Sequence, residues 1–210
     1  MSSSASESLH APQNGGRPAD TVYASKMLAQ FLTLLFSRPS AELVDLGPVV
    51  GANVAFIGER IGCKIHVEDL YADLDRHARQ DALDRFPQFL ERRLALLDGS
   101  VDAVLCWDIF DYLVPAAASV LAGEVIRVLR PGGVLLGFFS GGGPDDRGYT
   151  KYVIEDDWRL RLRGYAAAGQ RERVLHNREI TNLFGGLELF GSVLLKSGVR
   201  EVLFTKPDKT

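Results

Sequence analysis

The segment 41–71 constrains the fold most strongly, and it reads AELVDLGPVVGANVAFIGERIGCKIHVEDLY. A short apolar run leads into a turn that contains Gly47 and Gly51. Apolar residues then recur at helical spacing, and they alternate again before the acidic pair Glu68 and Asp69. This pattern predicts a strand, a tight glycine turn, a helix and a second strand that ends in an acid.

The glycine turn is a candidate ligand-binding site. Glycines let the backbone approach a ligand closely, and the amides at the N-terminus of the following helix face it. An acid just past the second strand lies where a ribose presents its hydroxyl groups, and both Glu68 and Asp69 satisfy this position. The glycines could equally serve only the turn and its packing. We favour ligand binding because the glycine spacing and the downstream acid agree.

The turn also carries a family resemblance. Asp45, Gly47 and Gly51 fit an acid-x-Gly-x-Gly-x-Gly motif in which Val49 takes the place of the middle glycine. The segment thereby resembles the class I S-adenosylmethionine-dependent methyltransferases, some of which keep only the first and last glycines. The resemblance implies that S-adenosylmethionine binds here. Asp45 would then position the turn or approach the amino group of the cofactor; the alternative role for Asp45 is a cap that only shapes the loop.

A second stretch is similar to the same family. The apolar strand predicted over 101–107 ends at Asp108 and is followed by an amphipathic helix over 116–129, a Leu-Arg-Pro-Gly-Gly turn and a strand over 134–139. With the first motif, the resemblance covers about 43–140. It implies that Asp108 lies near the methionine end of the cofactor, with a helix cap or a loop carboxylate as the alternative role.

The predicted fold class is α/β: a Rossmann-like doubly wound sheet, mostly parallel with a C-terminal antiparallel hairpin, and helices on both faces. Residues 1–20 are expected to form a disordered lead-in, and residues 21–210 a single methyltransferase-like domain. The remaining predicted elements are a helix over 21–37 capped by Asp20, a third parallel strand within 88–97, short strands over 152–154 and 158–163, a helix over 178–184, and hairpin strands over 187–195 and 199–205.

Composition excludes several classes of function. The net charge of −3 gives no global attraction to nucleic acid or anionic membrane, and we expect neither as a partner. No apolar run reaches the roughly 20 residues of a membrane-spanning helix, and the N-terminus lacks a secretory signal, so a cytoplasmic location is expected. The two cysteines, Cys63 and Cys106, lie in apolar runs, which predicts reduced buried thiols; no disulfide framework or metal-ligand spacing is present.

Two further groups of side chains are candidate contacts for a substrate. Arg159, Arg161 and Arg163 would share one face of a strand and could bind an anion, but we favour a solvated face opposite the acidic turn 155–157. Among the histidines, only His176 is placed to reach a substrate.

The resemblance implies an S-adenosylmethionine-dependent methyltransferase with an unidentified, small-molecule acceptor. Methyl transfer from a sulfonium needs chiefly alignment and a dry pocket, so no catalytic residue is assigned from the sequence. One alternative is a non-catalytic methyltransferase-like protein that binds a ligand or a partner. Another is a nicotinamide-nucleotide oxidoreductase, which the missing middle glycine disfavours more, because a pyrophosphate needs close backbone approach there. The sequence does not predict the oligomeric state.

Overall fold

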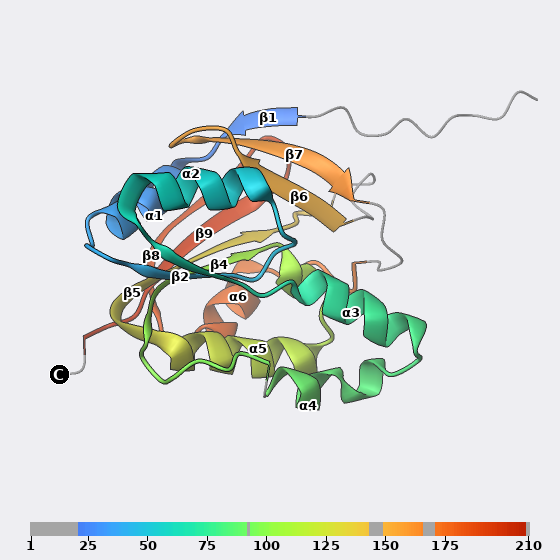
Figure 1. Ribbon diagram of the computed structural model, residues 1–210. Coiled ribbons are helices and arrows are strands. Elements are labelled where there is room, and N and C mark those ends of the chain that lie inside the picture. Colours follow the sequence, from blue (N-terminus) through green and yellow to red (C-terminus); the bar gives the residue numbers. More distant parts are fainter. Residues whose placement is uncertain (1–20, 92, 143–148, 166–170, 209–210) are drawn as a thin grey trace, which may run out of the picture.

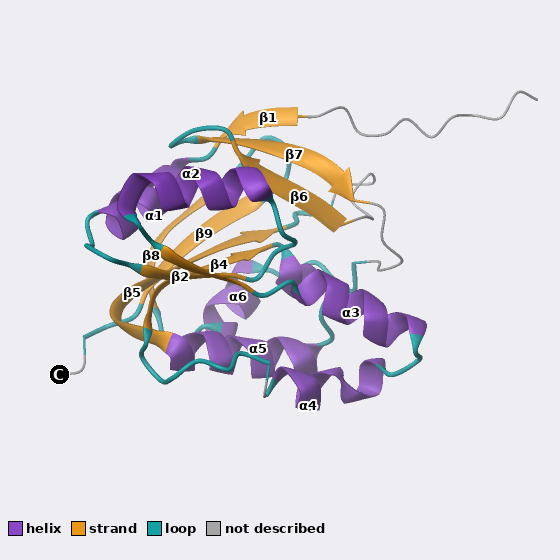
Figure 2. Cartoon of the chain, in the orientation of Figure 1, coloured by secondary structure: helices purple, strands orange, loops and turns teal. Residues whose placement is uncertain are grey.

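The computed structural model describes residues 21–91, 93–142, 149–165 and 171–208. A six-stranded sheet has helices on both faces, and a separate three-stranded sheet lies beside the start of α2 (Figures 1 and 2). The order of the large sheet is β3-β2-β4-β5-β9-β8. Its strands are β2 Glu42–Asp45, β3 Lys64–Val67, β4 Val101–Trp107, β5 Leu129–Phe139, β8 Glu188–Leu194 and β9 Arg200–Thr205.

The pairing of these strands confirms the predicted fold class. The first four strands in chain order pair in parallel, and β9 inserts antiparallel between β5 and β8. The predicted Leu-Arg-Pro-Gly-Gly turn is instead part of β5, which begins at Leu129. The other predicted strands and helices lie within a few residues of their expected positions, apart from the two corrections below. Among the described residues, no helix is long and apolar enough to cross a membrane.

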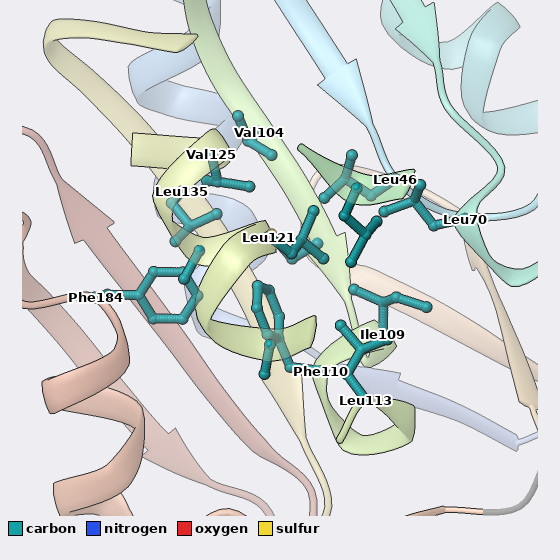
Figure 3. Close-up of a cluster of buried hydrophobic side chains, with 14 of the residues drawn as sticks. Leu46, Leu70, Val104, Ile109, Phe110, Leu113, Leu121, Val125, Leu135 and Phe184 are labelled. Carbon is teal, nitrogen blue, oxygen red and sulfur yellow. The ribbon is translucent and has the colours of Figure 1, made fainter. Parts of the chain in front are cut away.

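Helices pack on both faces of the large sheet because its central strand is apolar on both sides. In β4, Ala103 and Leu105 join one buried cluster and Val104 and Cys106 join the other. Figure 3 shows part of the second cluster, in which Val104 lies near side chains of α5. Helices α1 Lys26–Phe36 and α2 Gly51–Ile61 cover the first face; α3 Leu70–Arg79, α4 Phe86–Leu90, α5 Pro115–Val128 and α6 Asn177–Leu183 lie on the second.

The smaller sheet joins residues that are distant in sequence. Its antiparallel strands are β1 Thr21–Ala24, β7 Arg159–Tyr165 and β6 Tyr149–Ile154, in the order β1-β7-β6. The buried side chain of Asn53, in the first turn of α2, donates to the Tyr152 carbonyl and accepts from the Ile154 amide, both at 2.8 Å. One amide side chain therefore fixes β6 beside the glycine turn.

The predicted N-terminal helix begins later than expected. Residues 21–24 form β1, and α1 begins at Lys26 with Ser25 as its cap; the Ser25 hydroxyl accepts from the Leu28 amide at 3.1 Å. The sequence Thr-Val-Tyr-Ala favours a strand, and β7 supplies the partner. Asp20, the predicted cap, lies outside the described residues, as does the whole lead-in 1–20.

The predicted third parallel strand within 88–97 is wrong. The segment 86–90 forms helix α4, with Pro87 in its first turn, and the described residues from Glu91 to Leu97 contain no strand. Without a β-branched run the segment packs against α5 instead, and β2 pairs directly with β4.

Both cysteines are free thiols: Cys106 is buried as predicted, whereas Cys63 is partly exposed.

Candidate functional site

The carboxyl ends of the parallel strands bring the predicted acids to one edge of the sheet. Asp45 ends β2 and pairs with Val67 of β3 on one side and Leu105 of β4 on the other. Glu68 and Asp108 follow directly on those two strands. This edge is where open α/β sheets bind ligands.

Asp45 shapes the glycine turn from inside the protein. Its carboxylate is only 4% exposed, and it accepts hydrogen bonds from the Gly47 amide at 2.9 Å and from Trp107 Nε1 at 2.6 Å. Burial raises the pKa of Asp45 to about 6, although both hydrogen bonds act to lower it. The aspartate therefore orders the turn and also fixes an indole ring against it.

The two glycines of the turn differ in their surroundings. A Cβ atom added at Gly47 would lie 2.6 Å from Trp107 Nε1, so only glycine fits beneath the indole. A Cβ atom at Gly51 would meet nothing within 4 Å. Gly51 begins α2 after Val50, which provides no side-chain cap, and Gly51 and Ala52 are exposed. The amides at this helix start are available to a ligand.

Val49 does not fill the site. Its side chain is 62% exposed, so the residue that replaces the middle glycine takes up no space inside the turn. The loss of that glycine therefore restricts the backbone more than it restricts the space for a ligand.

The two candidate acids for a ribose have different partners. Glu68 forms an ion pair with Arg93, which also binds Asp73 at 2.6 Å. Asp69 caps α3, because its Oδ1 accepts from the Ala72 amide at 2.9 Å, and its side chain remains partly exposed. Arg93 thus neutralises Glu68, while Asp69 keeps a negative charge at the strand end.

Asp108 lies in a buried cluster that the sequence did not predict. It accepts from the Tyr71 hydroxyl and from Arg171 Nη2 at 3.2 Å. Arg171 Nε also lies 3.6 Å from the carboxylate of Asp111, which accepts from the Ser140 amide at 2.7 Å. Burial raises the pKa of Asp108 and raises that of Asp111 to about 7. One guanidinium therefore bridges two buried carboxyl groups.

Sequence reasoning named Asp108 but missed Arg171 as its partner, because 63 residues separate them and no spacing signals the contact. Two arginines of the predicted run do face the acidic turn, as expected. Arg159 binds Asp156 at 2.6 Å, and Arg161 binds Glu155 at 2.7 Å.

Trp107, at the end of β4, also belongs to this edge of the sheet. Its φ of +48° is rare for a tryptophan, and its ring packs against both Phe138 and Tyr152, with centroid separations of 5.7 and 5.2 Å. The stack and the hydrogen bond to Asp45 together hold this conformation. The indole thereby covers Gly47.

Two cavities lie near this edge. One of about 240 Å³ has mainly apolar walls from α3, α4 and the start of α5. The other, of about 500 Å³, adjoins Ser140 at the end of β5, and His176 lines it. The sequence predicts His176 as the histidine able to reach a substrate, and the cavity beside it agrees with that placement.

Comparison with known families identifies the unit that forms this edge. Residues 44–137 match the family described as methyltransferase domain. The segment 44–137 is therefore similar to a class I S-adenosylmethionine-dependent methyltransferase domain. No curated protein sequence shows significant similarity to the chain.

Solved structures share the fold of this methyltransferase domain. The Burkholderia thailandensis 1,6-didemethyltoxoflavin-N1-methyltransferase, solved with S-adenosylhomocysteine, is 18% identical, with a TM-score of 0.52 over 87% of this chain and 78% of that one. A SAM-dependent methyltransferase from Aquifex aeolicus is 14% identical, with a TM-score of 0.52 over 85% and 88%. The [4+2]-cyclase SpnF is 13% identical, with a TM-score of 0.52 over 86% and 82%.

The methyltransferase domain fits an adenosyl cofactor on one side of the turn and opposes it on the other. The uncapped helix start at Gly51 and the carboxylate of Asp69 offer amides and an acceptor for a nucleoside. On the other side, the indole of Trp107 fills the position that a Cβ atom would take at Gly47. The residues at Gly51 and Asp69 therefore fit the group, and Trp107 limits the space at Gly47.

Proposed function

We propose that this protein is an S-adenosylmethionine-dependent methyltransferase that acts on a small-molecule acceptor. The observation that carries the proposal is the uncapped, exposed start of α2 at Gly51, which lies at the carboxyl edge of a methyltransferase domain beside the acids that follow β3. The cofactor supplies an activated methyl group on a sulfonium. The protein must orient it and exclude water.

Each expected site residue has a place in this proposal. The amides around Gly51 face the cofactor, and Asp69 rather than Glu68 accepts from the ribose, because Arg93 already neutralises Glu68. Asp45 and Asp108 lie toward the methionine end, where Asp45 holds Gly47 and the Arg171 guanidinium holds Asp108. No side chain is assigned as a base, since an aligned acceptor with a free lone pair needs none.

A small acceptor is supported by the size of the cavities and by the sheet β1-β7-β6, which closes over the edge through Asn53 and the Trp107–Tyr152 stack. The Burkholderia thailandensis neighbour is named for a small acceptor of this kind. The net charge of −3 gives no global attraction to nucleic acid, which further supports a small-molecule acceptor.

The second candidate is a non-catalytic methyltransferase-like protein that binds a ligand or a partner. Two contacts favour it. The indole of Trp107 covers Gly47, and the Tyr71 hydroxyl donates a hydrogen bond to Asp108. The residues expected at the methionine end of the cofactor are therefore already in contact with other side chains of the protein. The fold alone does not imply methyl transfer, since one structural neighbour is named as a cyclase.

A matched pair of glycine substitutions in α2 tests the site. A Cβ atom added at Gly51 or at Gly58 would meet nothing within 4 Å, so neither backbone position excludes a side chain. We expect Gly51→Leu to weaken the binding of S-adenosylhomocysteine at least about tenfold in calorimetry, because its side chain covers the helix amides. Gly58→Leu should bind like the wild type. Equal affinity in both variants would show that the cofactor site is elsewhere.

A further inference from the structure

The cavity that adjoins Ser140 lies at the carboxyl end of β5, and backbone atoms form one of its walls. Its volume is about 500 Å³, and it lies between Ser140, the segment 174–178 and the β8–β9 hairpin. A Cβ atom at Gly141 would overlap the carbonyl oxygen of Gly198, so the two backbones pack directly against each other. Glycine at 141 therefore keeps the hairpin close and defines one side of the cavity.

Two arginines line this cavity without a carboxylate partner. Arg178 and Arg200 form no ion pair within 4.0 Å in the described part of the chain, whereas Arg127, for example, binds both Glu124 and Asp98. Most other arginines in the described ranges pair with an acid in the same way. The cavity therefore concentrates positive charge that no carboxylate of the described residues compensates.

The acids nearest in sequence to these arginines are used elsewhere. Glu179, next to Arg178, accepts from Arg173 and from the His176 amide, at 3.2 and 2.9 Å. Glu201, next to Arg200, is buried and accepts from the Met27 amide at the start of α1. Neighbouring carboxylates therefore do not neutralise Arg178 or Arg200.

We propose that this cavity binds the carboxylate or phosphate group of a small molecule, with Arg178 and Arg200 as the anion-binding residues. Guanidinium groups bind both anions through paired hydrogen bonds. Apolar side chains of Val174, Leu175 and Leu194 share the walls, which selects an acid with an apolar body.

The small acid that binds in this cavity is the methyl acceptor; this assignment rests on the proposed function. The cavity is connected to the expected methionine end through a short chain of contacts. The Ser140 amide donates to Asp111, and Arg171 joins Asp111 to Asp108 at the end of β4. An acceptor anchored at the arginines would extend toward that edge.

Calorimetric titration with benzoate, inorganic phosphate and benzamide tests the assignment. Benzoate combines a carboxylate with an apolar ring, benzamide has the same shape without the charge, and phosphate has the charge alone. We expect benzoate or phosphate to bind saturably, with benzamide at least about tenfold weaker than the better anion. The better of the two anions identifies the acidic group. Equal binding of benzamide and benzoate, or no binding of either anion, would overturn the proposal.

Substitutions locate the site. Arg178→Gln and Arg200→Gln should each weaken the binding of the better anion at least about tenfold, because each removes a charged hydrogen-bond donor. The matched control is Arg85→Gln, since Arg85 is exposed, lies in 83–85 outside the cavity and also lacks an ion pair in the described residues. Equal affinity in all three variants would contradict the assignment. Circular dichroism confirms that each variant is folded.

The same variants separate this inference from the proposed function. Arg178→Gln and Arg200→Gln should bind S-adenosylhomocysteine like the wild type, because the cofactor is expected at α2 and β3. Anion binding without any binding of S-adenosylhomocysteine would refute the methyltransferase proposal and leave the anion site in place. Binding of S-adenosylhomocysteine without anion binding would refute only the anion site.

Discussion

Trp107→Ala should increase the affinity for S-adenosylhomocysteine, because the indole occupies the space over Gly47. In the wild type, a cofactor that reaches this glycine must first displace the ring. The ring is held by two aromatic contacts, worth about 0.5–1.5 kcal/mol each, and by a hydrogen bond to the Asp45 carboxylate worth about 1.5–3 kcal/mol. Removing even the hydrogen-bond part of this cost predicts at least about tenfold tighter binding.

The same substitution should destabilise the fold. Truncation of a buried tryptophan costs about 3–5 kcal/mol, which urea denaturation measures. Phe139→Ala is the matched control, because Phe139 is equally buried but packs in the cluster on the opposite face of the sheet. It should lose similar stability and gain no affinity. Trp107→Leu, which keeps more apolar volume, repeats the test in a more stable protein.

Calorimetry on the folded variants decides the question. Tighter binding in both Trp107 variants and unchanged binding in Phe139→Ala is the expected result. If Trp107→Ala and Trp107→Leu bind no more tightly than the wild type, the ring does not oppose the cofactor, and the reasoning from Gly47 is refuted.

Three further predictions follow from the contacts of individual side chains. The pKa of Asp45 rises from 3.8 to about 6 by burial, so its carboxyl ionises later in the native protein than in the unfolded chain, and stability is lost as pH rises through this range. At about 1.4 kcal/mol for each pH unit, Asp45→Asn should gain up to about 3 kcal/mol relative to the wild type between pH 3 and pH 7 in urea titrations; a difference independent of pH would contradict this. Asp69→Ala removes the cap of α3, so it should lower the stability by about 1 kcal/mol and also weaken the binding of S-adenosylhomocysteine. Glu68→Ala should leave that affinity unchanged. The reverse order of the two affinities in calorimetry would assign the ribose to Glu68. Asn53→Ala removes two buried hydrogen bonds to β6, so we expect a loss of about 2–3 kcal/mol and faster hydrogen exchange in 149–154; unchanged exchange there would show that β6 is held by other contacts.

Local patterns predicted most of the fold correctly. The strand, turn and helix that begin at Glu42 depend on residues a few positions apart, and the sequence contains those signals directly. The antiparallel hairpin at the C-terminus was visible for the same reason. The family resemblance then supplied the parallel order that periodicity alone does not determine.

The errors involve contacts between distant residues. Residues 21–24 become a strand because β7, more than 130 residues later, pairs with them, and this pairing moves the helix cap to Ser25. The expected strand within 88–97 rested on the assumption of a doubly wound sheet, although no β-branched run was present.

The candidate site was predicted as a set of acids and glycines but not as a network. Arg93 distinguishes Glu68 from Asp69, and Arg171 bridges two carboxyl groups, from 25 and 63 residues away. Neither partner has a signal in the local sequence. The position of Trp107 over Gly47 likewise depends on a backbone conformation with positive φ, which the apolar strand pattern does not indicate.

Calorimetric titration of the wild-type protein with S-adenosylmethionine, S-adenosylhomocysteine and NADH tests the central claim most directly. The account predicts saturable binding of the two adenosyl ligands with one site per chain. It predicts no binding of NADH, because Val49 replaces the middle glycine that a pyrophosphate needs for close backbone approach. Absence of binding by both adenosyl ligands to the folded protein would contradict the cofactor site. That result would favour a methyltransferase-like protein whose own tryptophan fills the site.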